Sequence, residues 1–178
     1  MTMTANATIE LPRVGRYRLD TRRSTVTFRT RHLFGLAPVR GSFAARGGSL
    51  EVADPLGDSR ALVEIDSASF DSGNGQRDAS VRSARFLDAD RHPTMRFTAE
   101  RIERSGAGAT LAGTLVVGEV ARPVELSVER LGPHEGPRPG FTIRATTRID
   151  RFAFGLTAQR GMAGRHLDVT AEIVWLAA

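Results

Sequence analysis

Residues 141–150, Phe-Thr-Ile-Arg-Ala-Thr-Thr-Arg-Ile-Asp, alternate between two kinds of side chain. One set is Phe141, Ile143, Ala145, Thr147 and Ile149, and the other is Thr142, Arg144, Thr146, Arg148 and Asp150. Successive side chains of a strand point to opposite faces of its sheet. The pattern therefore predicts a strand with one face against an apolar interior and one face in water. Such a division is typical of antiparallel sheets.

The same alternation recurs along the chain. It covers residues 24–32, 39–45, 61–66, 95–100, 110–117, 124–129 and 166–175. About eight strands with one apolar face each favour closure, because open sheet edges promote aggregation. The predicted fold is an all-β antiparallel barrel of about eight strands. A sandwich of two sheets is consistent with the same pattern and remains the alternative.

The connections between these strands carry turn residues. Gly47-Gly48 and residues 105–108 are predicted hairpin turns, and residues 132–140 and 157–165 are predicted loops. One segment lacks the alternation, and a short helix is expected at about residues 76–84, near one end of the barrel. Asn74 is a suitable cap for it, and Asp78 suits its first turn.

Composition narrows the protein class. The chain has 178 residues, of which 40% are apolar and 25% charged, as expected for one globular domain. We expect a flexible tail over residues 1–15 and a single domain over residues 16–178. The absence of cysteine excludes disulfides and thiolate metal sites.

The charge pattern does not indicate a nucleic-acid partner. All 25 basic residues are arginine, the net charge is +5, and the arginines are interspersed with acidic residues. This distribution is typical of a solvated surface rather than a basic groove. The start of the chain lacks a basic stretch followed by an apolar run, and we found no apolar run of transmembrane length. We therefore expect a cytoplasmic protein that does not insert stably into membranes.

Several blocks, in order along the chain, resemble the YceI-like family of polyisoprenoid-binding proteins. They begin with Tyr17-Arg-Leu-Asp20 and continue through Asp71–Asn74, Arg77-Asp78, Phe86, His92-Pro93, Gly113–Gly118 and Arg151–Leu156. The resemblance covers residues 16–177, although Thr30 and Leu87 depart from the family's pattern. It implies a lipocalin-like barrel, often a homodimer, with a channel for an isoprenoid, quinone or fatty-chain lipid, and no cofactor.

Parity along the strands, together with the resemblance, supplies candidate site residues. The predicted lipid-binding residues are Val26, Phe28, His32, Phe43, Met95, Phe97, Leu115, Val117, Leu126, Phe141, Phe154 and Trp175. His32 is also a candidate contact for a polar head group. Arg77, Asp78 and Phe86 are candidates for the lid or for head-group binding. The function predicted from these residues is sequestration or transport of a long-chain lipid inside the barrel.

Other functions have less support in the sequence. We found no Gly-x-Ser-x-Gly motif, and the four histidines lie in different segments, so we do not predict an enzyme. Asp88, Asp90 and His92 would share one face of an extended chain, but nothing else points to a metal there. The remaining alternative is a barrel with a packed interior that acts in protein interactions or stress responses without a lipid.

Overall fold

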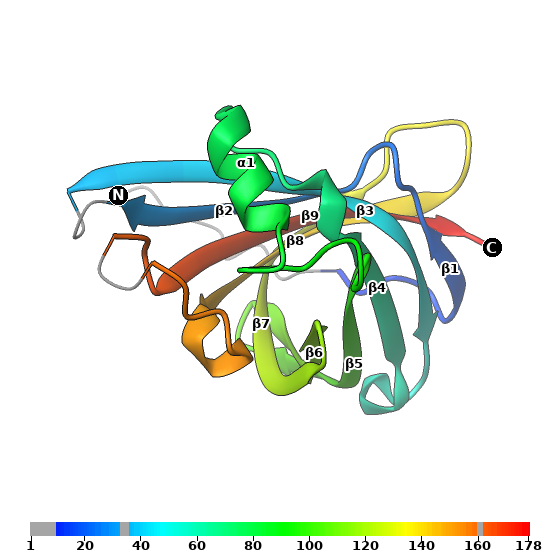
Figure 1. Ribbon diagram of the computed structural model, residues 1–178. Helices are drawn as coiled ribbons and strands as arrows, with labels where there is room; N and C mark the ends of the chain where they lie inside the picture. Colours follow the sequence, from blue (N-terminus) through cyan, green and yellow to red (C-terminus); the bar gives the residue numbers. More distant parts are fainter. Residues whose placement is uncertain (1–9, 33–35, 160–161) are drawn as a thin grey trace, which may run out of the picture.

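The computed structural model describes residues 10–32, 36–159 and 162–178, without the side chain of His32. The strands in this part of the chain are β1 (Gly15–Leu19), β2 (Thr25–His32), β3 (Ala37–Val52), β4 (Arg60–Asp66), β5 (Thr94–Ser105), β6 (Gly108–Val117), β7 (Val120–Pro133), β8 (Gly140–Asp150) and β9 (His166–Ala177). One α-helix, α1 (Gly75–Arg82), lies between β4 and β5 (Figure 1). Short 3-10 helices cover Leu56–Asp58, Ser67–Ser69 and Arg151–Phe154.

The strands form one closed antiparallel barrel. Their order is β1-β3-β2-β9-β8-β7-β6-β5-β4, and the β3–β4 pairing closes the ring. β2 pairs with the first part of β3 and β1 with its last part, and both also pair with β9. β1 and β2 therefore share one position, which leaves eight positions around the ring. The predicted barrel is confirmed, and the sandwich alternative is wrong.

The predicted hairpin turn at Gly47-Gly48 is wrong. β3 runs through both glycines, with a shift of register between Ala45 and Gly47, and the chain turns toward β4 only after Val52. A Cβ atom built on Gly48 would lie 2.5 Å from the carbonyl oxygen of Leu62 on β4. The lack of a side chain at Gly48 thus serves the close approach of two strands in a bulged region rather than a turn.

The predicted helix is present, with slightly different bounds. The Asn74 side chain accepts a hydrogen bond from the Arg77 amide at 3.0 Å, so the predicted N-cap forms. The helix ends at Arg82 rather than at residue 84. Val81 packs into a buried cluster with Leu87 and Phe154 at the end of the barrel where β4 leads into β5. We call this the α1 end.

Two connections close the α1 end and others lie at the opposite end. Residues 67–93 and the β8–β9 connection, residues 151–165, belong to the α1 end. The β3–β4 connection, residues 53–59, and the β7–β8 loop, residues 134–139, belong to the opposite end (Figure 1). No helix in the described part of the chain is both long and apolar enough to span a bilayer.

Candidate functional site

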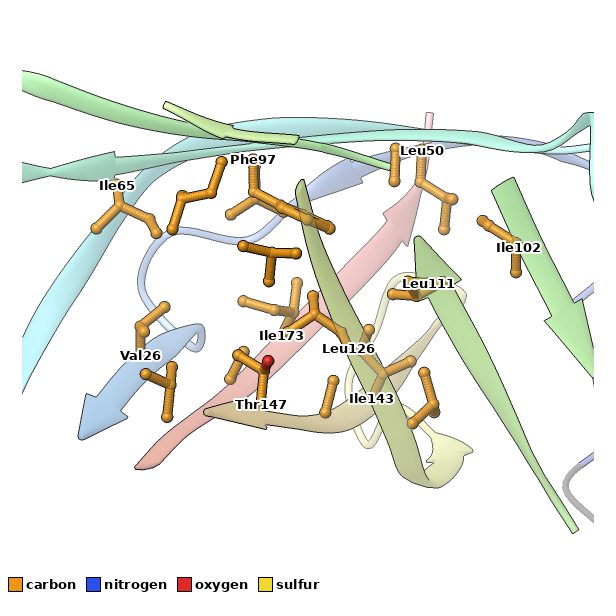
Figure 2. Close-up of a pocket in the computed structure, with 18 of the residues that line it drawn as sticks. Val26, Leu50, Ile65, Phe97, Ile102, Leu111, Leu126, Ile143, Thr147 and Ile173 are labelled. Atoms are coloured by element: carbon orange, nitrogen blue, oxygen red, sulfur yellow. The ribbon is translucent and has the colours of Figure 1, made fainter. Parts of the chain in front are cut away.

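The interior of the barrel contains a cavity. Its volume, counted as space for the centres of water-sized molecules, is about 230 Å³. By the same kind of measure, roughly 10–15 Å³ suffices for one water molecule, and packed cores contain few larger voids. Figure 2 shows side chains from strands on several sides of the barrel pointing toward this space. The interior is therefore not fully packed.

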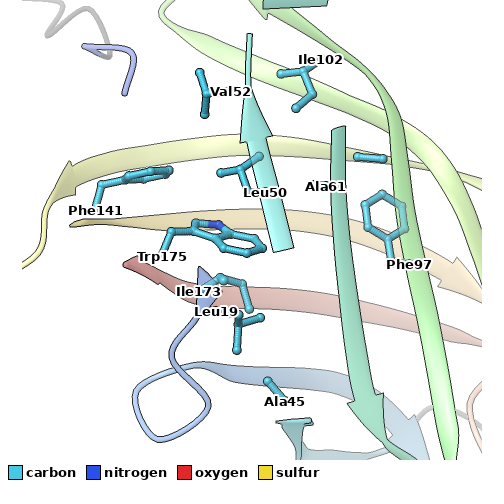
Figure 3. Close-up of a cluster of buried hydrophobic side chains, with 11 residues drawn as sticks. Leu19, Ala45, Leu50, Val52, Ala61, Phe97, Ile102, Phe141, Ile173 and Trp175 are labelled. Carbon is cyan, nitrogen blue, oxygen red and sulfur yellow. The ribbon is translucent and has the colours of Figure 1, made fainter. Parts of the chain in front are cut away.

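Most of the predicted lipid-binding residues contribute to the wall of this cavity. They are Val26, Phe43, Met95, Phe97, Leu115, Val117, Leu126, Phe141, Phe154 and Trp175. The Trp175 indole is only 2% exposed and lies among Phe141, Leu50 and Ile173 (Figure 3). The side chain of His32, a further candidate on β2, lies outside the described residues.

Phe28 faces the interior but does not line the cavity. Its ring stacks on Phe70, with centroids 5.3 Å apart, and approaches Phe43 at 5.9 Å. Phe70 belongs to the connection after β4, which runs back along β3 through paired hydrogen bonds between Ser42 and Asp71. Parity placed Phe28 on the correct face, but it gave no indication that this connection would cover the ring.

The three lid or head-group candidates lie within or beside the α1 segment. The Ser72 amide and hydroxyl donate to the Asp78 carboxylate at 3.0 and 2.6 Å, and Arg77 donates to the Ser72 hydroxyl at 3.3 Å. The ring of Phe86 lies under the guanidinium of Arg151, and its centroid is 5.6 Å from the guanidinium carbon. Arg77, Asp78 and Phe86 are not among the described residues that line the cavity.

Arg151 was not predicted as a site residue, yet it is buried and forms part of the cavity wall. Its guanidinium donates to the backbone carbonyls of Leu156, Ala158, Ala163 and Gly164, with the Nε–Gly164 distance at 2.7 Å. One side chain thus holds both halves of the β8–β9 connection at the α1 end. The sequence signal for it was the Arg-x-x-Phe-Gly block, because the alternation stops at Asp150.

The sequence also missed wall residues outside the regular strands. Leu56 and Leu87 come from connections at opposite ends of the barrel, and Leu11 and Pro12 come from the predicted tail. Only tertiary contacts reveal such residues, because they follow no period of two.

The polar side chains in the wall are engaged with the backbone. The Thr147 hydroxyl donates to the Glu125 carbonyl at 2.8 Å, and the Ser59 hydroxyl accepts from the Ala53 amide at 2.9 Å. Arg151 donates to the β8–β9 connection as described above. A polar ligand group placed in the cavity would lose its hydrogen bonds to water without compensation from these residues. The chemistry of the wall therefore suits hydrocarbon better than polar groups.

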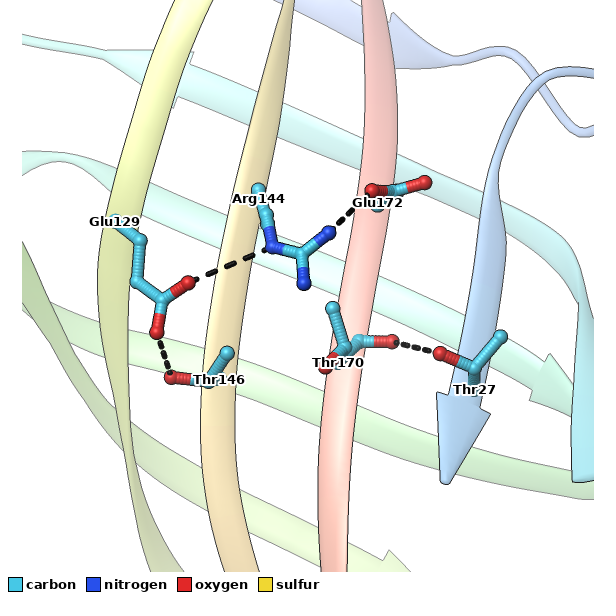
Figure 4. Close-up of polar contacts among 6 residues, drawn as sticks. All are labelled: Thr27, Glu129, Arg144, Thr146, Thr170 and Glu172. Carbon is cyan, nitrogen blue, oxygen red and sulfur yellow. Dashed lines mark hydrogen bonds and ion pairs between the residues drawn. The ribbon is translucent and has the colours of Figure 1, made fainter. Parts of the chain in front are cut away.

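The outer face of the barrel is polar, in keeping with the predicted alternation. Arg144 on β8 lies between Glu129 on β7, at 3.5 Å, and Glu172 on β9, at 2.8 Å (Figure 4). Thr146 donates to the other oxygen of Glu129 at 3.0 Å. The three charged side chains are exposed, so each ion pair contributes little to stability.

The metal alternative does not gain support from the geometry. Asp88 has a positive φ of 48°, and the chain around it is folded into turns. Residues at spacings of two therefore do not share one face, as they would in extended chain. No group of three or more metal-ligating side chains occurs within the described residues.

A pH-dependent ion pair connects the two ends of the β8–β9 connection. Arg165 donates to both carboxylate oxygens of Asp150, at 3.0 and 2.8 Å, and the Phe152 amide donates to one of them. The hydrogen bond from Arg165 is the main cause that lowers the pKa of Asp150 from 3.8 to about 2. Because the folded pKa is lowered, this carboxylate stabilises the fold above pH 3.8, and the contribution is lost as the pH falls toward about 2.

We therefore expect Asp150→Asn to lower the free energy of unfolding at near-neutral pH, and the difference from wild type to shrink between about pH 4 and pH 2. Urea unfolding at a series of pH values measures this difference. Asp90→Asn, in an exposed turn, is the control. A difference for Asp150→Asn that does not change with pH would contradict the assignment.

Comparisons with known proteins agree with this architecture. The sequence profile of the YceI-like domain matches residues 17–175. A UPF0312 protein from Serratia proteamaculans is 29% identical over 154 residues, which cover 83% of this chain and 78% of that protein. A UPF0312 protein from Ectopseudomonas mendocina is 30% identical over 153 residues, covering 83% and 79%.

Solved structures show the same fold. BcnA from Burkholderia cenocepacia superposes with a TM-score of 0.73 at 20% identity, covering 88% of this chain and 98% of that one. A polyisoprenoid binding domain from Saccharophagus degradans, implicated in plant cell wall breakdown, superposes with a TM-score of 0.65 at 14% identity. That match covers 93% of this chain and 100% of the domain.

Proposed function

This chain belongs to the YceI-like domain family, and from that premise we propose that it is a binding protein for a long-chain isoprenoid or similar lipid. The observation that carries the proposal is the closed barrel with an apolar cavity whose polar wall residues are engaged with the backbone. The relative from Saccharophagus degradans is a polyisoprenoid binding domain, which supports the same class of ligand.

The physical basis of binding is the transfer of hydrocarbon from water into the cavity. Each buried methylene contributes roughly 0.8 kcal/mol. Affinity should therefore rise with chain length until the cavity is full, and discrimination between tails of similar length should be weak. A polar head group would remain at an end of the barrel, in contact with water.

The single tryptophan provides a direct assay, because Trp175 is buried in the cavity wall. Titration with geraniol, farnesol and geranylgeraniol should change its emission, with affinity increasing about tenfold or more for each added isoprene unit. Organic extraction and native mass spectrometry of the purified protein should also reveal bound lipid. No response of Trp175 to any of these alcohols, together with no extractable lipid, would refute the proposal.

A cavity-filling variant tests the location of the ligand. Ala171 lines the cavity in the middle of β9, where it pairs with Val26 and Ala145. We expect Ala171→Phe to fold, to keep or raise the melting temperature, and to weaken farnesol binding at least tenfold, because the ring occupies the space of the chain. Trp175 emission and thermal unfolding measure the two effects.

The matched control is Thr170→Phe, one residue earlier on the same strand and on the opposite face. It should bind farnesol as the wild type does. A packed barrel without a ligand predicts the reverse for Ala171→Phe, a loss of roughly 1–3 kcal/mol of stability from overpacking. That outcome, together with no response of the wild type to lipid, would favour the alternative of a packed barrel that acts in protein interactions or stress responses.

A further inference from the structure

The chain segment before β1, residues 10–14, closes part of the cavity; we call it the strap. Gly15, which follows it, pairs with Val52 at the end of β3, so the strap joins the barrel at the end opposite α1 (Figure 1). Leu11 and Pro12 are half-buried and line the cavity, whereas Arg13 and Val14 are exposed. Two apolar side chains of the strap therefore face the space proposed for the lipid.

The strap is attached to the barrel through Tyr17. The Tyr17 hydroxyl donates to the Arg13 carbonyl at 2.7 Å. Its ring packs edge-on against Phe141 of the cavity wall, with centroids 5.0 Å apart and planes at 79°. This hydrogen bond ties the strap to a side chain that packs on the cavity wall.

Gly15 provides a hinge between the strap and β1. Its φ is +153°, which side chains rarely adopt, and no heavy atom lies within 4 Å of a Cβ built there. Glycine tolerates this conformation, and the open surroundings leave room for rotation. A rotation at Gly15 would move the strap while the rest of β1 stays paired with β3 and β9.

The α1 end is held much more firmly. Arg151 donates to four backbone carbonyls there, and Arg82 donates to the carbonyl of Phe70. Leu87 and Phe154 are buried against Met95. Local opening follows the segments with few buried contacts and few hydrogen bonds. Among the described residues, the strap therefore has fewer hydrogen bonds and buried contacts to break than the connections at the α1 end.

We propose that the strap is the gate through which the hydrocarbon chain enters and leaves the cavity, with Tyr17 as its latch and Gly15 as its hinge. This inference rests on the proposed lipid-binding function. It specifies the end of the barrel that opens and predicts that Tyr17 controls the rates of exchange more than the equilibrium affinity. Both rates depend on the open population, which the latch limits.

The first test does not need a lipid. Because the chain has no cysteine, Leu11→Cys places a single thiol on the inner side of the strap. Its alkylation by N-ethylmaleimide should be slow, and adding Tyr17→Phe should speed it about fivefold, as expected for the loss of one hydrogen bond. Val14→Cys, at a position 66% exposed, is the control and should react quickly with or without Tyr17→Phe.

The second test measures farnesol exchange by stopped-flow emission of Trp175. Tyr17→Phe should raise the association and dissociation rates together, about fivefold each, and change the affinity less than twofold. Thr27→Val is the control, since it also removes a hydroxyl bonded to a backbone carbonyl, that of Thr170, but on the outer face. It should leave both rates unchanged.

The outcomes separate the gate from the binding function. Equal alkylation rates for Cys at positions 11 and 14 in the otherwise wild-type chain would overturn the closed strap. Rapid alkylation induced by Tyr17→Phe without any change in farnesol exchange would overturn the gate. If Trp175 responds to no lipid while alkylation behaves as expected, the proposed function and the lipid gate both fail, and the closed strap itself is supported.

Discussion

Replacing Arg151 with methionine is expected to lower the free energy of unfolding by about 3 kcal/mol and to loosen the α1 end. The change removes the donors to Leu156, Ala158, Ala163 and Gly164. Each buried carbonyl left without a donor costs about 1–3 kcal/mol. The total stays below the full sum because parts of the β8–β9 connection are exposed, so some of these carbonyls can be hydrated instead.

Urea unfolding measures this loss of stability. Two further variants test whether it comes from the hydrogen bonds of the guanidinium. Arg151→Lys keeps the charge but replaces a planar fork with one compact ammonium, so it should recover less than half of the stability. Arg148→Met, at an exposed position on β8, should change stability by less than about 0.5 kcal/mol. Equal losses for Arg151→Met and Arg148→Met would show that the carbonyl contacts do not matter.

Replacing Gly113 with alanine is expected to destabilise the barrel by roughly 3 kcal/mol. Gly113 on β6 pairs with Ala99 on β5, directly beside a shift of register between Ala99 and Arg101. A Cβ atom built on Gly113 would overlap the carbonyl oxygen of Thr98 and lie 2.9 Å from Cα of Ala99. Both are backbone atoms of the neighbouring strand, so no rotamer change relieves the clash and the strands must separate.

Gly47→Ala is the matched comparison, because Gly47 also lies within a strand beside a shift of register. No heavy atom lies within 4 Å of a Cβ built on Gly47. The change should be neutral or stabilise by up to about 1 kcal/mol, since alanine restricts the unfolded chain. Urea unfolding of both variants gives the comparison. Similar losses at the two positions would indicate a general cost of removing glycine from these strands rather than a clash.

Much of the candidate site was predictable where it is built from regular strands, although Leu50 and Val52 on β3 lie beyond the wrongly predicted turn at Gly47-Gly48. Phe97, Leu126 and Trp175 line the cavity because each lies on the inward parity of its strand, and parity is a local property of extended chain. Phe28 and Arg151 show the limit of this rule. Phe28 is covered by Phe70, and Arg151 holds the β8–β9 connection, which begins where β8 ends. Both contacts depend on how connections fold back on the barrel.

The sequence by itself determined antiparallel strands that each have one apolar and one polar face, because an alternation with period two is a local signal that survives any register. The pairing of β3 with β4 in the tertiary structure decided for a closed barrel over a sandwich. The tertiary structure decided that the interior holds a cavity of about 230 Å³ and which segments close its ends. The free volume of a barrel depends on strand tilt, stagger and the sum of facing side chains, none of which appears in a single strand. For the same reason Leu11 and Pro12, in a segment without periodicity, became part of the wall only in three dimensions.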